Sequence, residues 1–404
     1  MYTTINTIRD TETPELIEKL IEFCGRNKVD RAIQKYKKSL QFSGRIYSDY
    51  YLKLRHPWWE AFIIYKKYLK SRKSFSGKLD ERIVNLVCDA KMIELLQQTM
   101  PNNVMKKFKR DLLDDDNAVN YLFELKTAWQ YYLKGHKIVW YDNKNKHPEF
   151  KVITDTFEFN VECKRISVDA SRKIRRSDFY KFIEMFVPKL VDMKIAGSIE
   201  IFLQSRLQSS PRNLKQVSSR ILELIKKGNF VGDFDLEDIT LKTNIVEGNN
   251  IIVDMKERFT DFYSRKPYGA HGILVTRDFN NYSVDPLEII VKSEKSDEYL
   301  TGIYEKLQTA ASTQLSNDIP GIIACYIPEI IDFTGLEKDS SLANMTYKLF
   351  SKKENEHLGA IIYVSDTLFL PKIYGRLTQN PALLFRNHYC KYETIKNYQF
   401  LNGN

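Results

Sequence analysis

Two glutamates and a lysine stand close together in the sequence. Pro148-Glu149 is followed thirteen residues later by Glu162-Cys163-Lys164. Residues two apart on a strand point to the same face, so Glu162 and Lys164 would lie side by side while Cys163 points into the protein. Such side chains can hold a divalent cation against a phosphodiester, because Mg²⁺ takes one or two carboxylates together with substrate phosphate.

Each of these residues has an expected role. Glu149 and Glu162 are the expected ligands of a Mg²⁺ or Mn²⁺ cofactor, and the backbone carbonyl of Cys163 is a third. A bound cation lowers the pKa of its water and polarises the phosphate. Lys164 is expected to position that water or to neutralise charge on the phosphate. The structural alternative is an ordinary surface ion pair, which is worth little.

Short elements that could position these residues are visible around them. Residues 136–141, 150–154 and 157–166 predict three successive strands, because aromatic and β-branched residues are frequent there. Residues 117–134 predict the preceding helix, which Gly135 ends. Glu124 lies on that helix, where it is expected to orient a water, a second metal or Lys164.

Further elements follow along the chain. Helices are predicted at about 30–40, 47–72, 79–99, 102–112, 171–193, 211–227 and 297–315, and strands at 198–204, 251–255, 272–276, 287–291, 321–327 and 360–364. Segment 229–270 is weakly patterned and reads as an insertion. Strands that alternate with helices predict an α/β or α+β fold.

Positive charge is concentrated in the first quarter of the chain. Residues 1–110 carry 23 Lys+Arg against 12 Asp+Glu, whereas the whole chain has a net charge of +10. The asymmetry predicts a basic helical domain over 1–112 that faces a polyanion, with residues 113–404 forming a second domain. Between Tyr50 and Tyr68 aromatic residues alternate with bases, which is typical of nucleic-acid binding or, alternatively, of a helix with an apolar core face and a solvated back.

Other classes of site find little support. The five cysteines are scattered without a CxxC pair, which argues against disulfides and zinc and favours a cytoplasmic protein. Apolar runs are too short to span a bilayer, and the N-terminus lacks a signal-peptide pattern. No GxSxG, Walker A, GxGxxG or HExxH motif is present.

A basic cluster follows the acid–lysine motif. Its members are Arg165, Arg172, Lys173, Arg175 and Arg176. Helix N-termini and arginines both suit phosphate, so these residues are expected to contact the backbone of a nucleic acid at the start of the 171–193 helix. The alternative is a solvated start of a helix.

Residues 117–204 resemble the PD-(D/E)xK nuclease superfamily, which has the restriction-endonuclease-like fold. By position Glu149 matches its first acid, Glu162 and Lys164 match its ExK, and Glu124 matches a helical glutamate found in part of the superfamily. The first acid is Glu here in place of the commoner Asp, which leaves Asp155 as an alternative ligand. Lys306 and Gln314 loosely resemble a helix of some large defence-type members.

The resemblance implies a mixed sheet flanked by helices and a metal-dependent endonuclease. DNA is the expected substrate, with RNA left open, and a homo-oligomer or a partner protein is compatible with the superfamily. Restriction, phage defence and mobile-element biology are all implied, and no residue selects among them. The alternative is a nucleic-acid-binding or assembly protein that uses a nuclease-like fold without cleavage.

Overall fold

The protein forms two compact units. The computed structural model describes residues 12–71, 80–141, 147–167, 172–193, 195–208, 210–228, 230–247, 254–258, 271–279, 282–295, 298–328, 333, 340–366 and 382–400. Unit 1 takes its residues from 1–38, 55–168 and 300–404, and unit 2 from 39–54 and 169–299. This division differs from the predicted boundary at 112/113, because the N-terminal helices belong with the first sheet.

Unit 1 begins with a layer of helices. They are α1 (Thr13–Cys24), α2 (Arg26–Phe42, which ends in unit 2), α4 (Lys53–Arg55, at the border of the units), α5 (Trp59–Ser71), α6 (Glu81–Leu96), the 3-10 turn η4 (Gln97–Thr99), α7 (Asn102–Asp111) and α8 (Ala118–Leu133). Their apolar faces meet in a core that includes Leu16, Trp58, Phe62, Leu86 and Leu122. The aromatic stripe of residues 50–68 thus contributes core residues.

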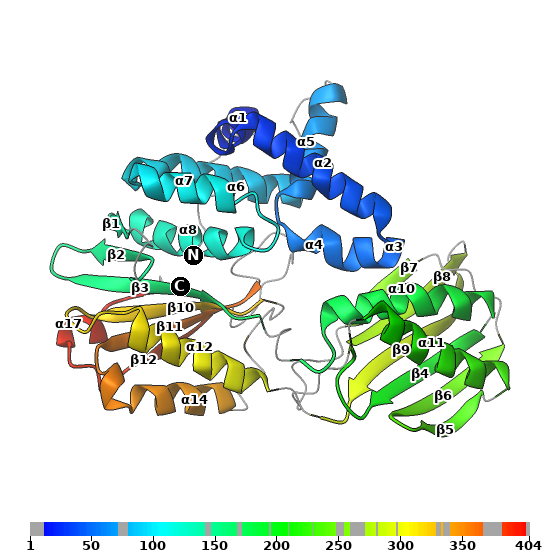
Figure 1. Cartoon of the computed structure of the whole chain (residues 1–404). Coiled ribbons are helices and arrows are strands. Elements are labelled where there is room, and N and C mark those ends of the chain that lie inside the picture. Colours follow the sequence, from blue (N-terminus) through cyan, green and yellow to red (C-terminus); the bar gives the residue numbers. More distant parts are fainter. Residues whose placement is uncertain are drawn as a thin grey trace. The chain divides into compact units, whose positions relative to one another are not determined.

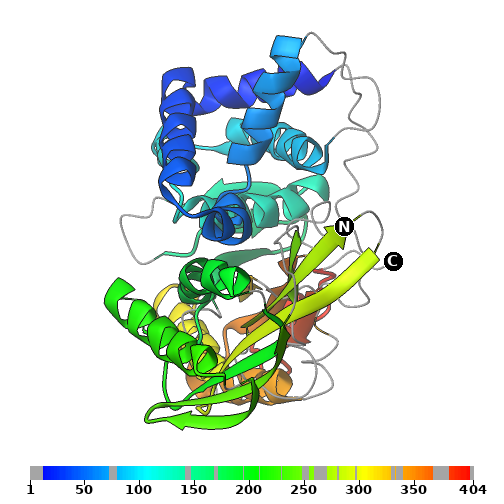
Figure 2. The same ribbon diagram turned by 90° about the vertical axis from the view of Figure 1, so that its right-hand side faces the viewer.

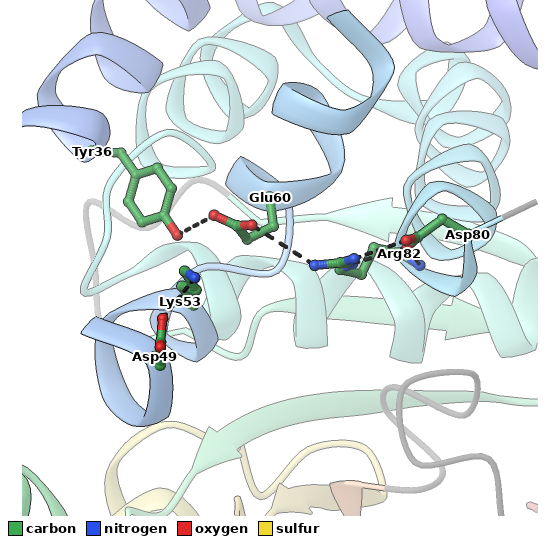
Figure 3. A network of polar contacts seen from close by, with 6 residues as sticks. All are labelled: Tyr36, Asp49, Lys53, Glu60, Asp80 and Arg82. Atoms are coloured by element: carbon green, nitrogen blue, oxygen red, sulfur yellow. Dashed lines mark hydrogen bonds and ion pairs between the residues drawn. The ribbon is translucent and has the colours of Figure 1, made fainter. Parts of the chain in front are cut away.

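Polar contacts tie three of these helices together. The hydroxyl of Tyr36 donates to Glu60 at 2.6 Å, and the other carboxylate oxygen of Glu60 lies 3.7 Å from Arg82 (Figure 3). Arg82 also bonds to Asp80, whose side chain caps α6 by accepting from the Arg82 backbone at 2.9 Å. Helices α2, α5 and α6 are therefore linked by one continuous network.

The sheet of unit 1 has the strand order β1-β2-β3-β10-β11-β12. Its strands are β1 (Lys137–Trp140), β2 (Phe150–Ile153), β3 (Glu158–Arg165), β10 (Gly321–Tyr326), β11 (Leu358–Val364) and β12 (Ala382–Arg386). Strands β3, β10 and β11 are parallel to one another, and the other neighbours are antiparallel. The central strands are buried along their length, as expected for strands covered on both faces.

Helices cover both faces of this sheet. Helices α6, α7 and α8 lie over one face, and α12 (Tyr299–Thr313) and α14 (Ser341–Phe350) lie over the other (Figure 1). The 3-10 turn η5 (Lys353–Asn355) and α17 (Glu393–Lys396) complete the unit. On the first face, the ring of Tyr131 in α8 packs against Phe159 of β3, with ring centroids 5.4 Å apart. Helix α8 therefore joins the helical layer to the sheet.

Unit 2 is a second sheet with its own helices. It contains α3 (Arg45–Tyr47), the π-helix η3 (Ser48–Leu52), α10 (Arg176–Asp192), β4 (Ile195–Leu203), α11 (Pro211–Lys226), β5 (Val231–Leu236), β6 (Ile239–Glu247), β7 (Asp254–Arg258), β8 (His271–Phe279) and β9 (Tyr282–Ser293). The strand order is β5-β6-β4-β9-β8-β7, and only β4 and β9 pair in parallel.

The core of unit 2 lies between this sheet and its helices. Helices α10 and α11 lie next to each other (Figure 2), and Phe179, Phe182 and Phe186 of α10 are fully buried with Ile199 of β4. The segment 39–54 joins this core, since the Tyr47 backbone N–H donates to Glu184 of α10 at 2.9 Å.

The coarse fold prediction is confirmed: the protein is mixed α/β, with two mixed sheets flanked by helices and an N-terminal helical region. Two details were wrong. The predicted helix 47–72 is interrupted at His56–Trp58, because Pro57 lacks an N–H and disfavours a helical residue before it. Helix α10 begins at Arg176, later than expected. Segment 229–270, expected to be an insertion, contains the β5–β6 hairpin.

Candidate active site

The acid–lysine motif lies where β3 extends beyond its neighbour β2. The β2–β3 pairing ends at Phe150 and Val161, whereas β3 stays paired with β10 as far as Arg165. Glu149 directly precedes β2, and its backbone N–H donates to the Val161 carbonyl at 3.1 Å. This register places Glu149 next to Glu162, as expected from the predicted strands 150–154 and 157–166.

Glu162 is a buried carboxylate that is half satisfied. Its exposed fraction is 0%, and its Oε1 accepts a hydrogen bond from Nζ of Lys164, which keeps 22% of its side chain exposed. The other oxygen, Oε2, is buried and has no hydrogen-bond partner among the described residues. A buried polar atom without a partner is costly and rare, so this oxygen is a candidate acceptor for a bound cation or water.

The surroundings of Glu162 disfavour its charge. Burial is the main cause that raises its pKa, followed by the nearby charge of Glu149; together, against the opposing effects of Lys164 and Lys107, they bring the pKa to about 7. Two carboxylates that share a desolvated site repel each other in this way. A cation between them would relieve both the burial and the repulsion.

Glu124 of α8 lies close to the carboxylates of Glu149 and Glu162. Burial is the main cause that raises its pKa, followed by the charge of Glu149, while Lys107 and Lys164 oppose the shift. One turn further along α8, Thr127 makes a hydrogen bond with the Cys163 thiol. Cys163 therefore points toward α8 and into the protein, and its carbonyl lies between Glu162 and Lys164 on the part of β3 that extends past β2.

Lys107 of α7 is a member of this group that sequence reasoning missed. Its Nζ lies 3.9 Å from Oε2 of Glu149, and 4.7 Å from the ring centroid of Tyr121 on α8. The only sequence signal is its place beside the buried Val104 and Phe108 of α7, which puts it at the border of an apolar face. That signal marks a half-buried lysine and does not specify its partner.

Asp155, the alternative first acid, lies elsewhere. It is exposed in the turn between β2 and β3, where the Thr154 backbone N–H donates to the Phe157 carbonyl at 2.9 Å. Glu149 and Asp155 thus flank opposite ends of β2. The four residue steps from Glu158 to Glu162 span roughly 13 Å of strand, so Asp155 is not brought together with Glu162.

Lys306 and Gln314 lie on or next to α12. The charges of Lys306 and Lys164 both act on the thiol of Cys325, the β10 residue that pairs with Lys164. Gln314 directly follows α12, and its buried Oε1 has no hydrogen-bond partner among the described residues. Lys306 therefore lies near the lysine end of the candidate site.

The basic cluster is divided between the units. Arg165 ends β3 in unit 1, whereas Arg172, Lys173, Arg175 and Arg176 belong to unit 2. Only Arg176 is helical, so the expectation that the cluster forms the first turn of the following helix is corrected: its other members precede α10. Within unit 2, Nζ of Lys173 lies 3.7 Å from Glu298, and the guanidinium of Arg176 lies 5.7 Å from the Tyr180 ring centroid.

The described residues contain no ready-made metal cage of three or more His, Cys, Asp or Glu side chains. The pair Glu149 and Glu162 fits a cation of the magnesium type, which usually keeps several waters and takes few protein ligands. Among the described helices, none is long and apolar enough to cross a membrane. Comparisons with protein-family models, curated proteins and solved structures found no match.

Proposed function

We propose that this protein is a divalent-metal-dependent nuclease that hydrolyses phosphodiester bonds, with DNA as its main substrate. The observation that carries the proposal is the buried carboxylate of Glu162, which has one oxygen on Lys164, the other without a partner, and Glu149 beside it. Perturbed carboxylates beside a lysine are typical of sites that do chemistry.

The residues have distinct tasks in this proposal. Glu149 and Glu162 hold Mg²⁺ or Mn²⁺, together with the Cys163 carbonyl. The metal supplies a water of lowered pKa and a polarised phosphate. Lys164 stays at the scissile phosphate, where its charge offsets the negative charge that develops there. Glu124 orients the group from α8.

The order of elements around the site supports the proposal. Helix α8 and strands β1–β3 are followed in unit 1 by α12 and β10, because the residues between β3 and α12 belong to unit 2. A helix, three strands, a helix and a parallel strand is the order that the nuclease resemblance implies. The expected strand 198–204 is β4 of the other sheet, so the helix and the parallel strand that follow β3 in this order are α12 and β10.

Cleavage assays test the proposal. Supercoiled and linear DNA, and an RNA of matched length, are incubated with Mg²⁺ or Mn²⁺ and wild type, Lys164→Ala or Lys151→Ala protein. Lys151 is the matched control, because it lies on the neighbouring strand in a surface pair with Glu158 at 3.0 Å. We expect cleavage by wild type and Lys151→Ala only. Equal cleavage by all three would refute the site.

A second candidate is a nucleic-acid-binding protein without cleavage. The observation that favours it is the lack of a three-ligand cage among the described side chains. Binding of labelled DNA that stays intact with every divalent cation would support this reading over the nuclease.

A further inference from the structure

Lys107 is a second lysine of the candidate site, contributed by the helical layer. Its Nζ lies 3.9 Å from Oε2 of Glu149, and both side chains are mostly buried, with 22% of Lys107 and 15% of Glu149 exposed. Most lysines of the basic N-terminal quarter have exposed side chains, so the inward position of Lys107 distinguishes it from a solvated basic surface.

The pair of Lys107 and Glu149 is loose. Its 3.9 Å separation exceeds hydrogen-bond length, whereas Lys164 is hydrogen-bonded to Glu162. The ring of Tyr121 holds the Lys107 ammonium from another side, with 4.7 Å to the centroid. The ammonium thus contacts Glu149 and the ring of Tyr121, and of these two only Glu149 is a candidate metal ligand.

The charges of the four residues balance in the cation-free protein. Glu149 faces Lys107, and Glu162 faces Lys164. If Glu162 holds a divalent cation through Oε2, Lys164 keeps its bond to Oε1, whereas coordination by Glu149 would compete with its loose contact to Lys107. A phosphate oxygen is then a suitable new acceptor for the Lys107 ammonium.

We propose that Lys107 is a phosphate-binding residue of this site, held by Glu149 in the cation-free protein and transferred to the substrate phosphate when Glu149 binds a metal ion. The proposal rests on the proposed nuclease function and adds to it a substrate contact from α7.

The first test is metal affinity. Mn²⁺ is titrated calorimetrically into full-length wild type, Lys107→Met and Lys106→Met proteins. Methionine keeps the aliphatic stem of lysine, and the neighbouring Lys106 is an exposed control. Removal of a competing cation from Glu149 should tighten Mn²⁺ binding by up to about fivefold in Lys107→Met, since an ion pair of this kind is worth up to about 1 kcal/mol. Lys106→Met should match wild type.

The second test is binding of substrate, measured by fluorescence anisotropy with labelled duplex DNA in Ca²⁺ and in EDTA, with a gel to check that the DNA is intact. In Ca²⁺, Lys107→Met should bind DNA more weakly, and its log–log salt slope should be shallower by about one, the value of one phosphate contact. In EDTA the variant should equal wild type. Lys107→Arg should restore the binding seen in Ca²⁺.

Tighter Mn²⁺ binding together with weaker DNA binding supports the proposal, because a merely structural role would not move the two in opposite directions. Tighter Mn²⁺ binding with unchanged DNA binding would overturn it. It would also be overturned if Lys107→Met and Lys106→Met both equalled wild type in the two measurements. If wild type binds no Mn²⁺ at all, the nuclease proposal fails, and the role of Lys107 fails with it.

Discussion

Glu162 and Lys164, two residues apart on β3, form an ion pair in which the carboxylate is fully buried and the lysine reaches solvent. Burying a charge is unfavourable even when a partner is present. The second oxygen of Glu162 lacks a partner among the described residues, so the pair alone does not offset the burial. The buried carboxylate of Glu162 is therefore unfavourable in the folded protein, and a bound cation would offset that cost.

Stability should therefore depend on pH through Glu162. Its pKa of about 7 in the folded protein exceeds the ordinary glutamate value of 4.5. The unfolded chain releases this proton first, so the contribution of Glu162 to the free energy of unfolding falls between pH 4.5 and 7 and is constant above that. The full loss is about 3 kcal/mol. Urea unfolding in EDTA at pH 5 and pH 8 measures it.

Glu162→Gln should remove this pH-dependent loss and be more stable than wild type at pH 8. Glu158→Gln, on the same strand but part-exposed, is the matched control and should behave like wild type. A Glu162→Gln protein whose stability falls as steeply as that of wild type would contradict the prediction.

The first acid can be tested by a pair of isosteric variants. Glu149→Gln should lower cleavage roughly 100-fold or more, as for other groups that stabilise charge in a transition state. Asp155→Asn should stay within about twofold of wild type, because Asp155 lies in the turn at the other end of β2. The measurement is the initial rate on linear DNA with Mg²⁺. A larger loss in Asp155→Asn would reverse the assignment.

A buried polar network between α6 and α8 should contribute strongly to stability. Asp89 of α6 accepts from Trp58 Nε1 at 2.9 Å and lies 3.1 Å from Nζ of Lys126 on α8. Asp89→Ala leaves a buried lysine without this carboxylate and should lower the free energy of unfolding by about 3 kcal/mol or more. Asp30→Ala, which breaks the exposed pair with Lys66, should cost less than about 1 kcal/mol. Equal losses would refute the distinction.

The basic cluster of unit 2 should act through phosphate contacts if it meets nucleic acid. Lys173→Ala should make the log–log salt dependence of DNA binding shallower by about one. Lys226→Ala, an exposed lysine at the end of α11, is the control and should leave the slope unchanged. An unchanged slope for Lys173→Ala would remove this residue from the nucleic-acid interface.

The sequence predicts local elements well and their partners poorly. Strands β1, β2 and β3 and helix α8 appear within a few residues of their predicted bounds, because aromatic and β-branched runs and Gly135 mark them. The register that brings Glu149 beside Glu162 follows from a short antiparallel hairpin. The pairing of β3 with β10 and the second sheet have no local signal, since both depend on contacts between distant segments.

The candidate site follows the same rule: neighbours in the sequence were predictable, and contacts between distant segments were not. Glu162 and Lys164 share a strand, so their spacing predicts their proximity. Lys107 comes from another helix, and its contact with Glu149 depends on how α7 packs in the helical layer. The oxygen of Glu162 without a partner is a property of three-dimensional packing, which no residue pattern reveals.

The parallel pairing of β3 with β10 sets the order in which the protein can be completed during synthesis. Residues Asn160 to Arg165 of β3 are synthesised well before their partners Gly321 to Tyr326 of β10. All strands of unit 2 are synthesised between these two segments. Unit 2 has every strand of its sheet before β10 leaves the ribosome, whereas β3 does not have its long partner. The sheet that carries Glu149 and Glu162 therefore stays incomplete until about four fifths of the chain have been translated.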